Sequence, residues 1–138
     1  MGTSIRDAMT SNPSNVETSS SVVEAARLMK SEDVGSIPVT EGDRLVGIVT
    51  DRDIAIRVVA EGKDVRSVTV GEIASKDLVT VDPQQDLDEA LRLMAQHQVR
   101  RLPVVEEDGR LVGILAQADI AHQGDDTKTG QVVEQISN

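Results

Sequence analysis

The sequence contains an internal duplication, and this repeat restricts the possible folds more than any other feature. VEAARLMKSED, which begins at Val23, is matched 65 positions later by DEALRLMAQHQ, and SIPVT at Ser36 is matched by RLPVV at Arg101. RLVGIVTDRDIA, which begins at Arg44, is matched 66 positions later by RLVGILAQADIA. Such self-similarity indicates two copies of one supersecondary unit that bury their apolar faces against each other.

Within each copy, the hydrophobic pattern predicts the order strand, helix, strand, strand, helix. We therefore expect an α/β fold in which two such repeats pack about a pseudo-two-fold axis. The elements expected in the first copy are a strand from Val16, a helix over 22–33, strands over 36–40 and 44–50, and a helix over 51–61. Those expected in the second are a strand over 78–81, a helix from Asp86, strands over 101–105 and 110–115, and a final helix.

A short helix is expected before each copy, over 5–9 and after Thr69, where Thr69-x-x-Glu72 forms a capping box. These assignments divide the chain into the first repeat with its N-terminal helix, the second repeat, and a tail that holds a short docking helix. The corresponding residue ranges are 1–68, 69–123 and 124–138.

Two further details of the strands are predicted. RLVGIVT is an almost continuous apolar run, which favours a strand covered on both faces. Pro38 has no amide hydrogen, so its strand is expected at a sheet edge or in an irregular position.

The junction GIVTDRDI, in which an apolar strand leads into a helix, is the candidate ligand site. Thr50 can cap that helix, whose first amide groups lack partners and favour an anion. Asp53 is an acceptor that suits two vicinal hydroxyls, such as those of a ribose. The alternative is that Thr50-x-x-Asp53 is a capping box that needs no ligand.

The second copy keeps the acid as Asp119 but replaces the hydroxyl residue with Ala116. The lost hydroxyl removes a cap and a phosphate donor, each worth about 1 kcal/mol. We therefore predict tighter binding at Thr50 and weak or no binding at Ala116. Because Asp119 remains without its capping partner, a role in capping alone is also less favoured for these aspartates.

Both copies contain an h-P-V strand, in which h is a hydrophobic residue, followed by G-I-(V/L)-x-x-x-D-I. Through this repeated pattern, residues 5 to 123 resemble a stand-alone pair of CBS domains, also called a Bateman module. The resemblance implies clefts between the repeats that bind adenosine derivatives such as AMP, ADP, ATP or S-adenosylmethionine. It also implies a homodimer formed through the helices. Because the sequence shows no catalytic or DNA-binding domain fused to the pair, we expect the regulated partner to be a separate, unidentified protein.

The same resemblance assigns roles to individual positions. It implies that Thr50 contacts phosphate and Asp53 contacts ribose, with Asp119 as the second copy's counterpart. The start of each h-P-V strand would hold the base, and a basic residue just before it would reach phosphate. The residues at these places are Val34 and Gly35 in the first copy, and Val99, Arg100 and Arg101 in the second.

The basic residues have simpler interpretations as well. Arg100 and Arg101 are adjacent, and neighbouring strand residues point to opposite faces, so at most one of them can face a given site. Arg52 lies in the first helical turn, where a cation is unfavourable unless an anion is close. A ligand phosphate or an acidic neighbour would satisfy Arg52 equally well.

Composition excludes several functions. The net charge of −10 and the absence of aromatic residues argue against binding nucleic acid. There is no cysteine, no apolar run long enough to cross a bilayer and no leader pattern, so we expect a cytoplasmic protein without a metal centre. No nucleophile with a plausible base appears, which predicts that the protein is not an enzyme.

The function expected from these patterns is that of a non-catalytic sensor that binds an adenosine-containing ligand and regulates a partner. The alternative is an interaction or structural dimer with empty, degenerate ligand sites, acting as a stress- or hypoxia-response protein. Ligand-induced stabilisation separates the two, because only an occupied site shifts the unfolding equilibrium.

Overall fold

The computed structural model describes residues 3–123, and the chain forms two compact units. Residues 14–78 form one unit, which we call the first-copy unit. Of the described residues, 3–13 and 79–123 form the other, the second-copy unit. The tail 124–138, for which a docking helix is expected, lies outside the described residues.

Each short helix lies in the compact unit of the other repeat, not in the unit of the repeat that follows it in the sequence. Helix α1 (Ile5–Ala8) belongs to the second-copy unit, where the Ile5 amide donates to the Gln85 carbonyl over 2.8 Å. Helix α4 (Val70–Ile73) belongs to the first-copy unit, where the Val70 amide donates to the Ser20 carbonyl over 2.8 Å. The repeats and the compact units are therefore different divisions of the chain.

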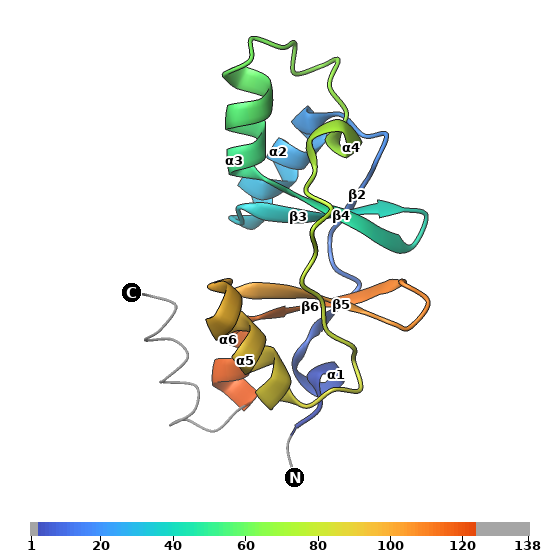
Figure 1. Cartoon of the computed structure of the whole chain (residues 1–138), viewed down its shortest axis with the longest axis vertical. Coiled ribbons are helices and arrows are strands. Elements are labelled where there is room, and N and C mark those ends of the chain that lie inside the picture. The colour runs from blue at the N-terminus through green and yellow to red at the C-terminus, as the bar shows by residue number, and fades with distance from the viewer. Residues whose placement is uncertain (1–2, 124–138) are drawn as a thin grey trace. The chain divides into compact units, whose positions relative to one another are not determined.

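The first-copy unit is a three-stranded sheet with helices on one face (Figure 1). Its other elements are β2 (Val16–Glu17), α2 (Val22–Glu32), β3 (Ser36–Glu41), β4 (Arg44–Thr50), α3 (Asp51–Ile54) and η1 (Ala55–Val59). The strand order is β2-β3-β4, with β2 parallel and β4 antiparallel to β3. The last helix continues from α3 as a π-helical turn, in which the Ala60 amide donates to the Ala55 carbonyl.

Of the two positions expected for Pro38, the sheet edge is wrong, because β3 is the central strand. The irregular position is confirmed, because the register with β4 shifts between Val39 and Thr40, directly after Pro38. Pro38 is tolerated there because β2 is only two residues long and pairs with Val39 and Thr40. The missing amide hydrogen of Pro38 therefore falls beyond the paired part of β2. The expected burial of β4 on both faces is also only partial, since Gly47 and Val49 are buried and their neighbours are half-buried.

The second-copy unit has the same plan, with helices on one face of a sheet of order β1-β6-β5 (Figure 1). Its elements besides α1 are β1 (Thr10–Ser11), α5 (Leu87–His97), β5 (Arg101–Val105), β6 (Leu111–Ala116) and α6 (Gln117–Gln123). The strand expected over 78–81 is reduced to one parallel bridge between Val81 and Val104. Val81 donates to the Pro103 carbonyl and accepts from the Val105 amide, and Pro83 follows too soon for more pairing.

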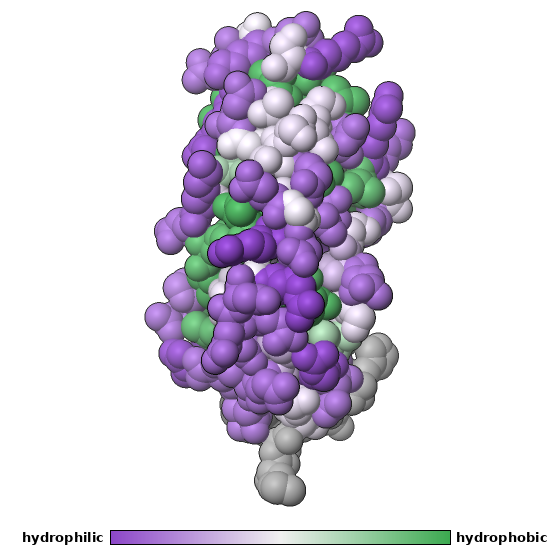
Figure 2. All heavy atoms as spheres, turned by 90° about the vertical axis from the view of Figure 1, so that its right-hand side faces the viewer, coloured by the Kyte–Doolittle hydropathy of each residue, from purple (hydrophilic) through white to green (hydrophobic). Residues whose placement is uncertain are grey.

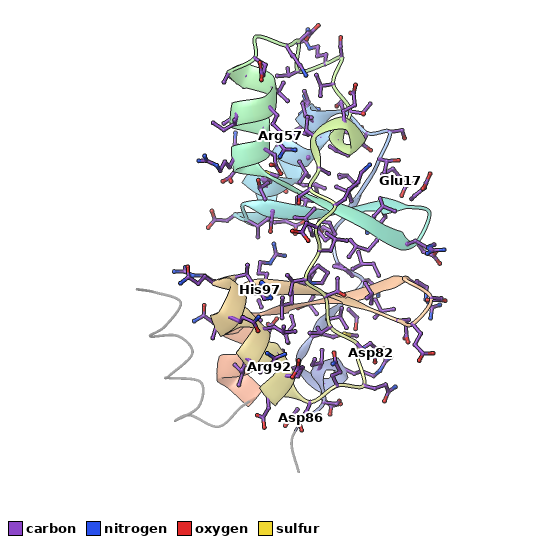
Figure 3. All side chains as sticks on the ribbon, viewed as in Figure 1. Glu17, Arg57, Asp82, Asp86, Arg92 and His97 are labelled. Atoms are coloured by element: carbon purple, nitrogen blue, oxygen red, sulfur yellow. The ribbon has the colours of Figure 1, made fainter. Side chains whose placement is uncertain are left out.

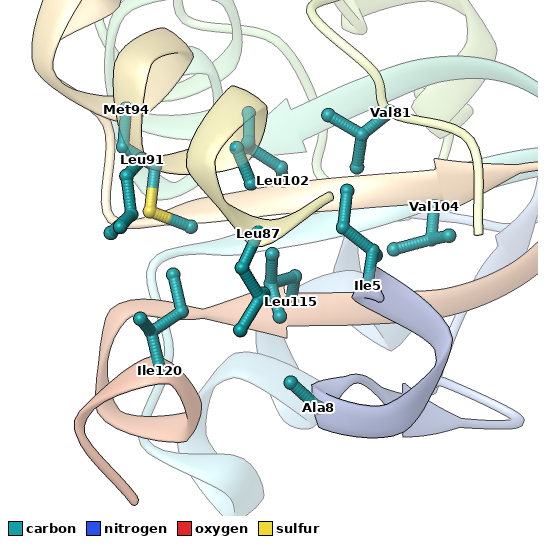
Figure 4. Close-up of a cluster of buried hydrophobic side chains, with 11 residues drawn as sticks. Ile5, Ala8, Val81, Leu87, Leu91, Met94, Leu102, Val104, Leu115 and Ile120 are labelled. Carbon is teal, nitrogen blue, oxygen red and sulfur yellow. The ribbon is translucent and has the colours of Figure 1, made fainter. Parts of the chain in front are cut away.

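Each unit has an apolar core of its own. In the second-copy unit, α1, α5, both long strands and α6 contribute side chains, as Figure 4 shows. Met94 is fully buried in this core, and its counterpart Met29 is buried in the core of the first-copy unit. Hydrophilic residues cover most of the face drawn in Figure 2, with apolar residues in separate patches. Among residues 3–123 no helix has the length and apolar character that a bilayer span requires.

Candidate functional site

Thr50 and Asp53 lie where β4 passes into α3, and their side chains cap the helix. The Thr50 hydroxyl accepts from the Asp53 amide over 3.0 Å, and Asp53 Oδ2 accepts from the Thr50 amide over 2.9 Å. The capping box considered from the sequence is thus complete. It uses one lone pair of the hydroxyl and one carboxylate oxygen, which leaves the hydroxyl hydrogen and Asp53 Oδ1 for other contacts.

Arg57 is a member of this site that the sequence pattern does not reveal. Its Nε lies 3.9 Å from Asp53 Oδ1, and the Asp53 side chain is 15% exposed. Its Nη1 donates to the Ile73 carbonyl over 3.0 Å. The four-residue spacing from Asp53 on one helix was the available signal, since residues at that spacing are neighbours on the helix surface.

The start of β3 lies beside this junction. The Asp51 amide donates to the Gly35 carbonyl over 2.9 Å, and Ser36 is the pairing partner of Thr50. A Cβ on Gly35 would lie 3.1 Å from Asp51 Oδ2, so the missing side chain leaves room for that carboxylate. Val34 is half-buried against the core. The fold therefore brings Val34 and Gly35 to the same end of the sheet as Thr50 and Asp53.

The junction in the second-copy unit has the same backbone geometry. The Gln117 amide donates to the Arg100 carbonyl over 2.8 Å, as Asp51 does to Gly35. Asp119 Oδ2 accepts from the Ala116 amide over 3.0 Å, so half of the capping box persists without a hydroxyl. Asp119 therefore has a capping role without a hydroxyl partner, so its presence no longer argues against a role of these aspartates in capping alone.

The cross-strand pair at each junction differs in chemistry. Ser36 lies opposite Thr50 in the first-copy unit, whereas Arg101 lies opposite Ala116 in the second-copy unit. Residues directly opposite each other have Cβ atoms about 5 Å apart on one face of the sheet. A pair of hydroxyl residues is thus replaced by an arginine and a small residue.

The remaining predicted residues take simple positions. Arg101 is half-buried, Arg100 just before it is exposed, and Val99 packs against the core. Arg52 is exposed in the first turn of α3, which also carries Asp51 and Asp53. Because acidic neighbours are present, Arg52 does not by itself require a bound anion.

A separate hollow in the first-copy unit contains none of the predicted ligand residues. Its volume is about 270 Å³, and its walls are mainly apolar side chains of α2, of the end of α3 and of the turn region between η1 and α4: Val22, Val23, Ala26, Arg27, Lys30, Ile54 and Val65. Among residues 3–123 there is also no group of three or more His, Asp or Glu side chains that could hold a metal ion.

Comparison with known proteins shows a family relationship over both copies. The family model described as CBS domain matches residues 5–60 and again residues 70–125. The CBS domain-containing protein YhcV of Bacillus subtilis is 43% identical over 136 residues, which cover 98% of this chain and 96% of that protein. Hypoxic response protein 1 of Mycobacterium tuberculosis is 42% identical over 120 residues, covering 86% of this chain and 83% of the relative.

Solved structures agree in fold. The structure of hypoxic response protein 1, determined with two coordinated zinc ions, has a TM-score of 0.78 and 41% identity, covering 87% of this chain and 98% of that one. CBSX2 in complex with AMP has a TM-score of 0.74 and 28% identity, covering 99% and 100%. The CBS pair of MJ0100, in complex with 5′-methylthioadenosine and S-adenosyl-L-methionine, has a TM-score of 0.72 and 28% identity, covering 87% and 98%.

Proposed function

Because the chain belongs to the CBS domain family, we propose that it is a non-catalytic regulatory module that binds an adenosine-containing ligand at the Thr50–Asp53 junction. One observation carries the proposal: at one strand–helix junction the capping box uses the Thr50 hydroxyl only as an acceptor and Asp53 only through Oδ2. Arg57 Nε lies 3.9 Å from Asp53 Oδ1, which is beyond hydrogen-bond distance, so Oδ1 keeps its capacity to accept. Solved relatives of the same fold hold AMP or S-adenosyl-L-methionine, which supports this ligand class.

In this proposal each residue of the first-copy unit has a distinct role. The Thr50 hydroxyl donates to a ligand phosphate, and Asp53 Oδ1 accepts from the ribose hydroxyls. Val34 and the exposed backbone of Gly35 contact the base, because the chain has no aromatic side chain on which a base could stack. Arg52 supplies positive charge in the same helical turn. AMP, ADP, ATP and S-adenosylmethionine are the candidate ligands. The role of Thr50 applies to the three nucleotides, because S-adenosylmethionine has no phosphate and shares with them only the ribose and the base.

The second junction is proposed to bind the same ligand class more weakly. Ala116 cannot donate to phosphate, and a lost hydrogen bond of this kind weakens binding by about 1 kcal/mol. Arg101, opposite Ala116, and the neighbouring Arg100 provide positive charge that offsets part of this loss. Asp119 and Val99 then take the places of Asp53 and Val34.

We further propose that the protein is a cytoplasmic homodimer that passes ligand binding to a separate protein. Ile56 and Val59 are 49% and 62% exposed, and they are the large apolar side chains that the described residues leave exposed. Such residues on one short helical segment are suited to contact a second copy.

The second candidate function is an interaction protein whose junctions stay empty, for example in a stress response. The complete capping box favours it, because that box is stable without a ligand. Thermal melting by calorimetry with each of the four ligands separates the two functions. At a ligand concentration a hundred times the dissociation constant, the free energy of unfolding should rise by about 2.7 kcal/mol. An unchanged melting temperature with all four would favour the interaction protein.

A further inference from the structure

We propose that Arg57 connects the Thr50–Asp53 junction to residues 74–78, the segment by which the chain leaves the first-copy unit. In this role Arg57 is a positioning residue that acts through Asp53 and the Ile73 carbonyl. The inference deepens the proposed function, because it describes how occupancy of that site would be passed on. Its ligand-dependent part rests on that function.

The first contact joins Arg57 to the end of α4. Its Nη1 donates to the carbonyl of Ile73, the last residue of that helix, over 3.0 Å. Figure 3 shows Arg57 between the helix that follows β4 and the turn of α4. The last carbonyl groups of a helix lack partners within the helix, so a side-chain donor there stabilises the helix end. Ile73 is itself buried, which fixes the position of the acceptor.

The second contact joins the same guanidinium to the candidate site. Arg57 Nε lies 3.9 Å from Asp53 Oδ1, close enough for charge attraction but too far for a hydrogen bond. The guanidinium is planar, and its donors have a fixed geometry. A movement of the Asp53 carboxylate therefore changes the orientation of the group that holds the Ile73 carbonyl.

The segment beyond Ile73 is attached to the strand that ends at Thr50. The Ser75 amide donates to the Ile48 carbonyl over 2.8 Å, and the Ile48 amide donates to the Ser75 carbonyl over 2.9 Å. A Cβ on Gly47 would lie 3.0 Å from the Ser75 carbonyl oxygen, so the two chains are in close contact. Opening of this two-bond bridge is thus a sensitive measure of how firmly the segment is held.

The connection is specific to the first copy in sequence. The position 66 residues after Arg57 is Gln123, which has no charge to pair with the carboxylate of Asp119. The two junctions therefore differ in this link as well as in the hydroxyl residue. Ligand binding at the Asp53 junction would alter residues 74–78 through Arg57, whereas binding at the Asp119 junction would not.

The ligand-free test measures amide hydrogen exchange at Ser75 in the full chain. Arg57→Gln should raise the Ser75 exchange rate about fivefold, because the carbonyl at the end of α4 loses its donor. Asp53→Asn should raise it about twofold in the wild-type background. It should cause no further change in the Arg57→Gln background. Arg44→Gln, which changes an exposed arginine at the start of β4 in the same unit, is the control and should leave Ser75 unaffected.

Two results would overturn the inference. One is an unchanged Ser75 rate in Arg57→Gln, and the other is an equal effect of Asp53→Asn in both backgrounds. Arg57 is 55% exposed, so its replacement by glutamine should leave the fold intact, which circular dichroism can verify.

The ligand arm adds saturating AMP and repeats the measurement, with binding itself followed by calorimetry. AMP should slow Ser75 exchange about twofold in the wild type by fixing the Asp53 carboxylate, and should have no such effect in Arg57→Gln. Equal slowing in both proteins would contradict the path through Arg57. If calorimetry shows no binding of AMP, ADP, ATP or S-adenosylmethionine to the wild type, the proposed function fails. The ligand-free measurements on the Arg57 and Asp53 variants still decide whether Asp53 is linked to Ser75.

Discussion

Thr50 and Asp53 donate backbone hydrogen bonds to each other's side chains, over 3.0 Å to the hydroxyl and 2.9 Å to the carboxylate. Their counterparts keep only the second of these bonds, from the Ala116 amide to Asp119. The two halves of the capping box are therefore separable. The carboxylate half is common to both copies, and the hydroxyl half belongs to the first copy alone.

This separation predicts opposite effects for two reciprocal substitutions. Thr50→Ala should lower the free energy of unfolding by about 1 kcal/mol, because it removes the hydroxyl half of a complete box. Ala116→Thr should raise it by a smaller amount, because Asp119 already supplies the other half. Chemical denaturation followed by circular dichroism measures both, since the chain has no Trp for fluorescence. A neutral Thr50→Ala would show that the cap contributes nothing to stability.

A glycine substitution tests the attachment of the segment after α4. In Gly47→Ala the new Cβ would lie 3.0 Å from the Ser75 carbonyl oxygen and 3.2 Å from Ala74 Cβ. Backbone must shift to relieve this contact, so we expect a loss of about 1–3 kcal/mol in the free energy of unfolding.

The matched control is Gly35→Ala, where the nearest atom is the carboxylate of Asp51 at 3.1 Å. This short side chain can rotate away, so the change should cost clearly less than Gly47→Ala. Equal costs for the two substitutions would contradict the close approach of Gly47 to the backbone of Ser75. Both values come from the same denaturation experiment.

The helices, the strands and the junctions between them could largely be predicted, because each depends on residues that are close together in the sequence. The repeat, the capping residues and the apolar spacing located α2 and α5 to within a residue or two. The family relationship expected from the h-P-V and D-I patterns is confirmed. Thr50, Asp53 and Gly35 could be placed at one end of a sheet by strand pairing alone.

The features that the sequence did not predict depend on contacts between distant segments. No local pattern shows that α1 packs with the second copy and α4 with the first. Pro38 is tolerated in a central strand because β2 pairs only with Val39 and Thr40, and the length of that pairing cannot be read from the sequence. For Arg57 only the four-residue spacing from Asp53 could be read from the sequence. Its bond to the Ile73 carbonyl could not, because a backbone carbonyl has no signature in the sequence.

We expect Glu17 to contribute to stability in a pH-dependent way. Figure 3 labels this residue near the turn that joins β3 to β4. The buried Thr40 hydroxyl donates to Glu17 Oε2 over 2.8 Å, and the Gly42 amide donates to Oε1 over 3.1 Å. These bonds, Thr40 first, lower the pKa of Glu17 below its usual value. The folded protein therefore binds this proton less readily than the unfolded chain does.

The sign of the effect follows from linkage. A lowered pKa in the folded state stabilises the protein above the unfolded pKa of about 4.3, and the contribution is lost as the pH falls through the folded value. Glu17→Gln should consequently flatten the fall in melting temperature between about pH 5 and pH 3. Glu41→Gln, at an exposed position in the same sheet, is the control. Identical pH profiles for Glu17→Gln and the wild type would contradict this role of Glu17.

Metal removal should have no effect on the described part of the chain. Residues 3–123 contain no cluster of three potential metal ligands, and the whole chain has no cysteine, although the related hypoxic response protein 1 was solved with two zinc ions. Dialysis against a chelator should leave the calorimetric melting temperature unchanged. A fall that added zinc reverses would reveal a metal site that these residues do not predict.

A crystal structure of the protein soaked with millimolar AMP will show whether the Thr50–Asp53 junction binds a sugar phosphate. We expect density for the nucleotide, with ribose hydroxyls within hydrogen-bond distance of Asp53 Oδ1 and phosphate at the Thr50 hydroxyl. Density for water alone at this junction, with Asp53 bonded only to the Thr50 amide, would contradict it.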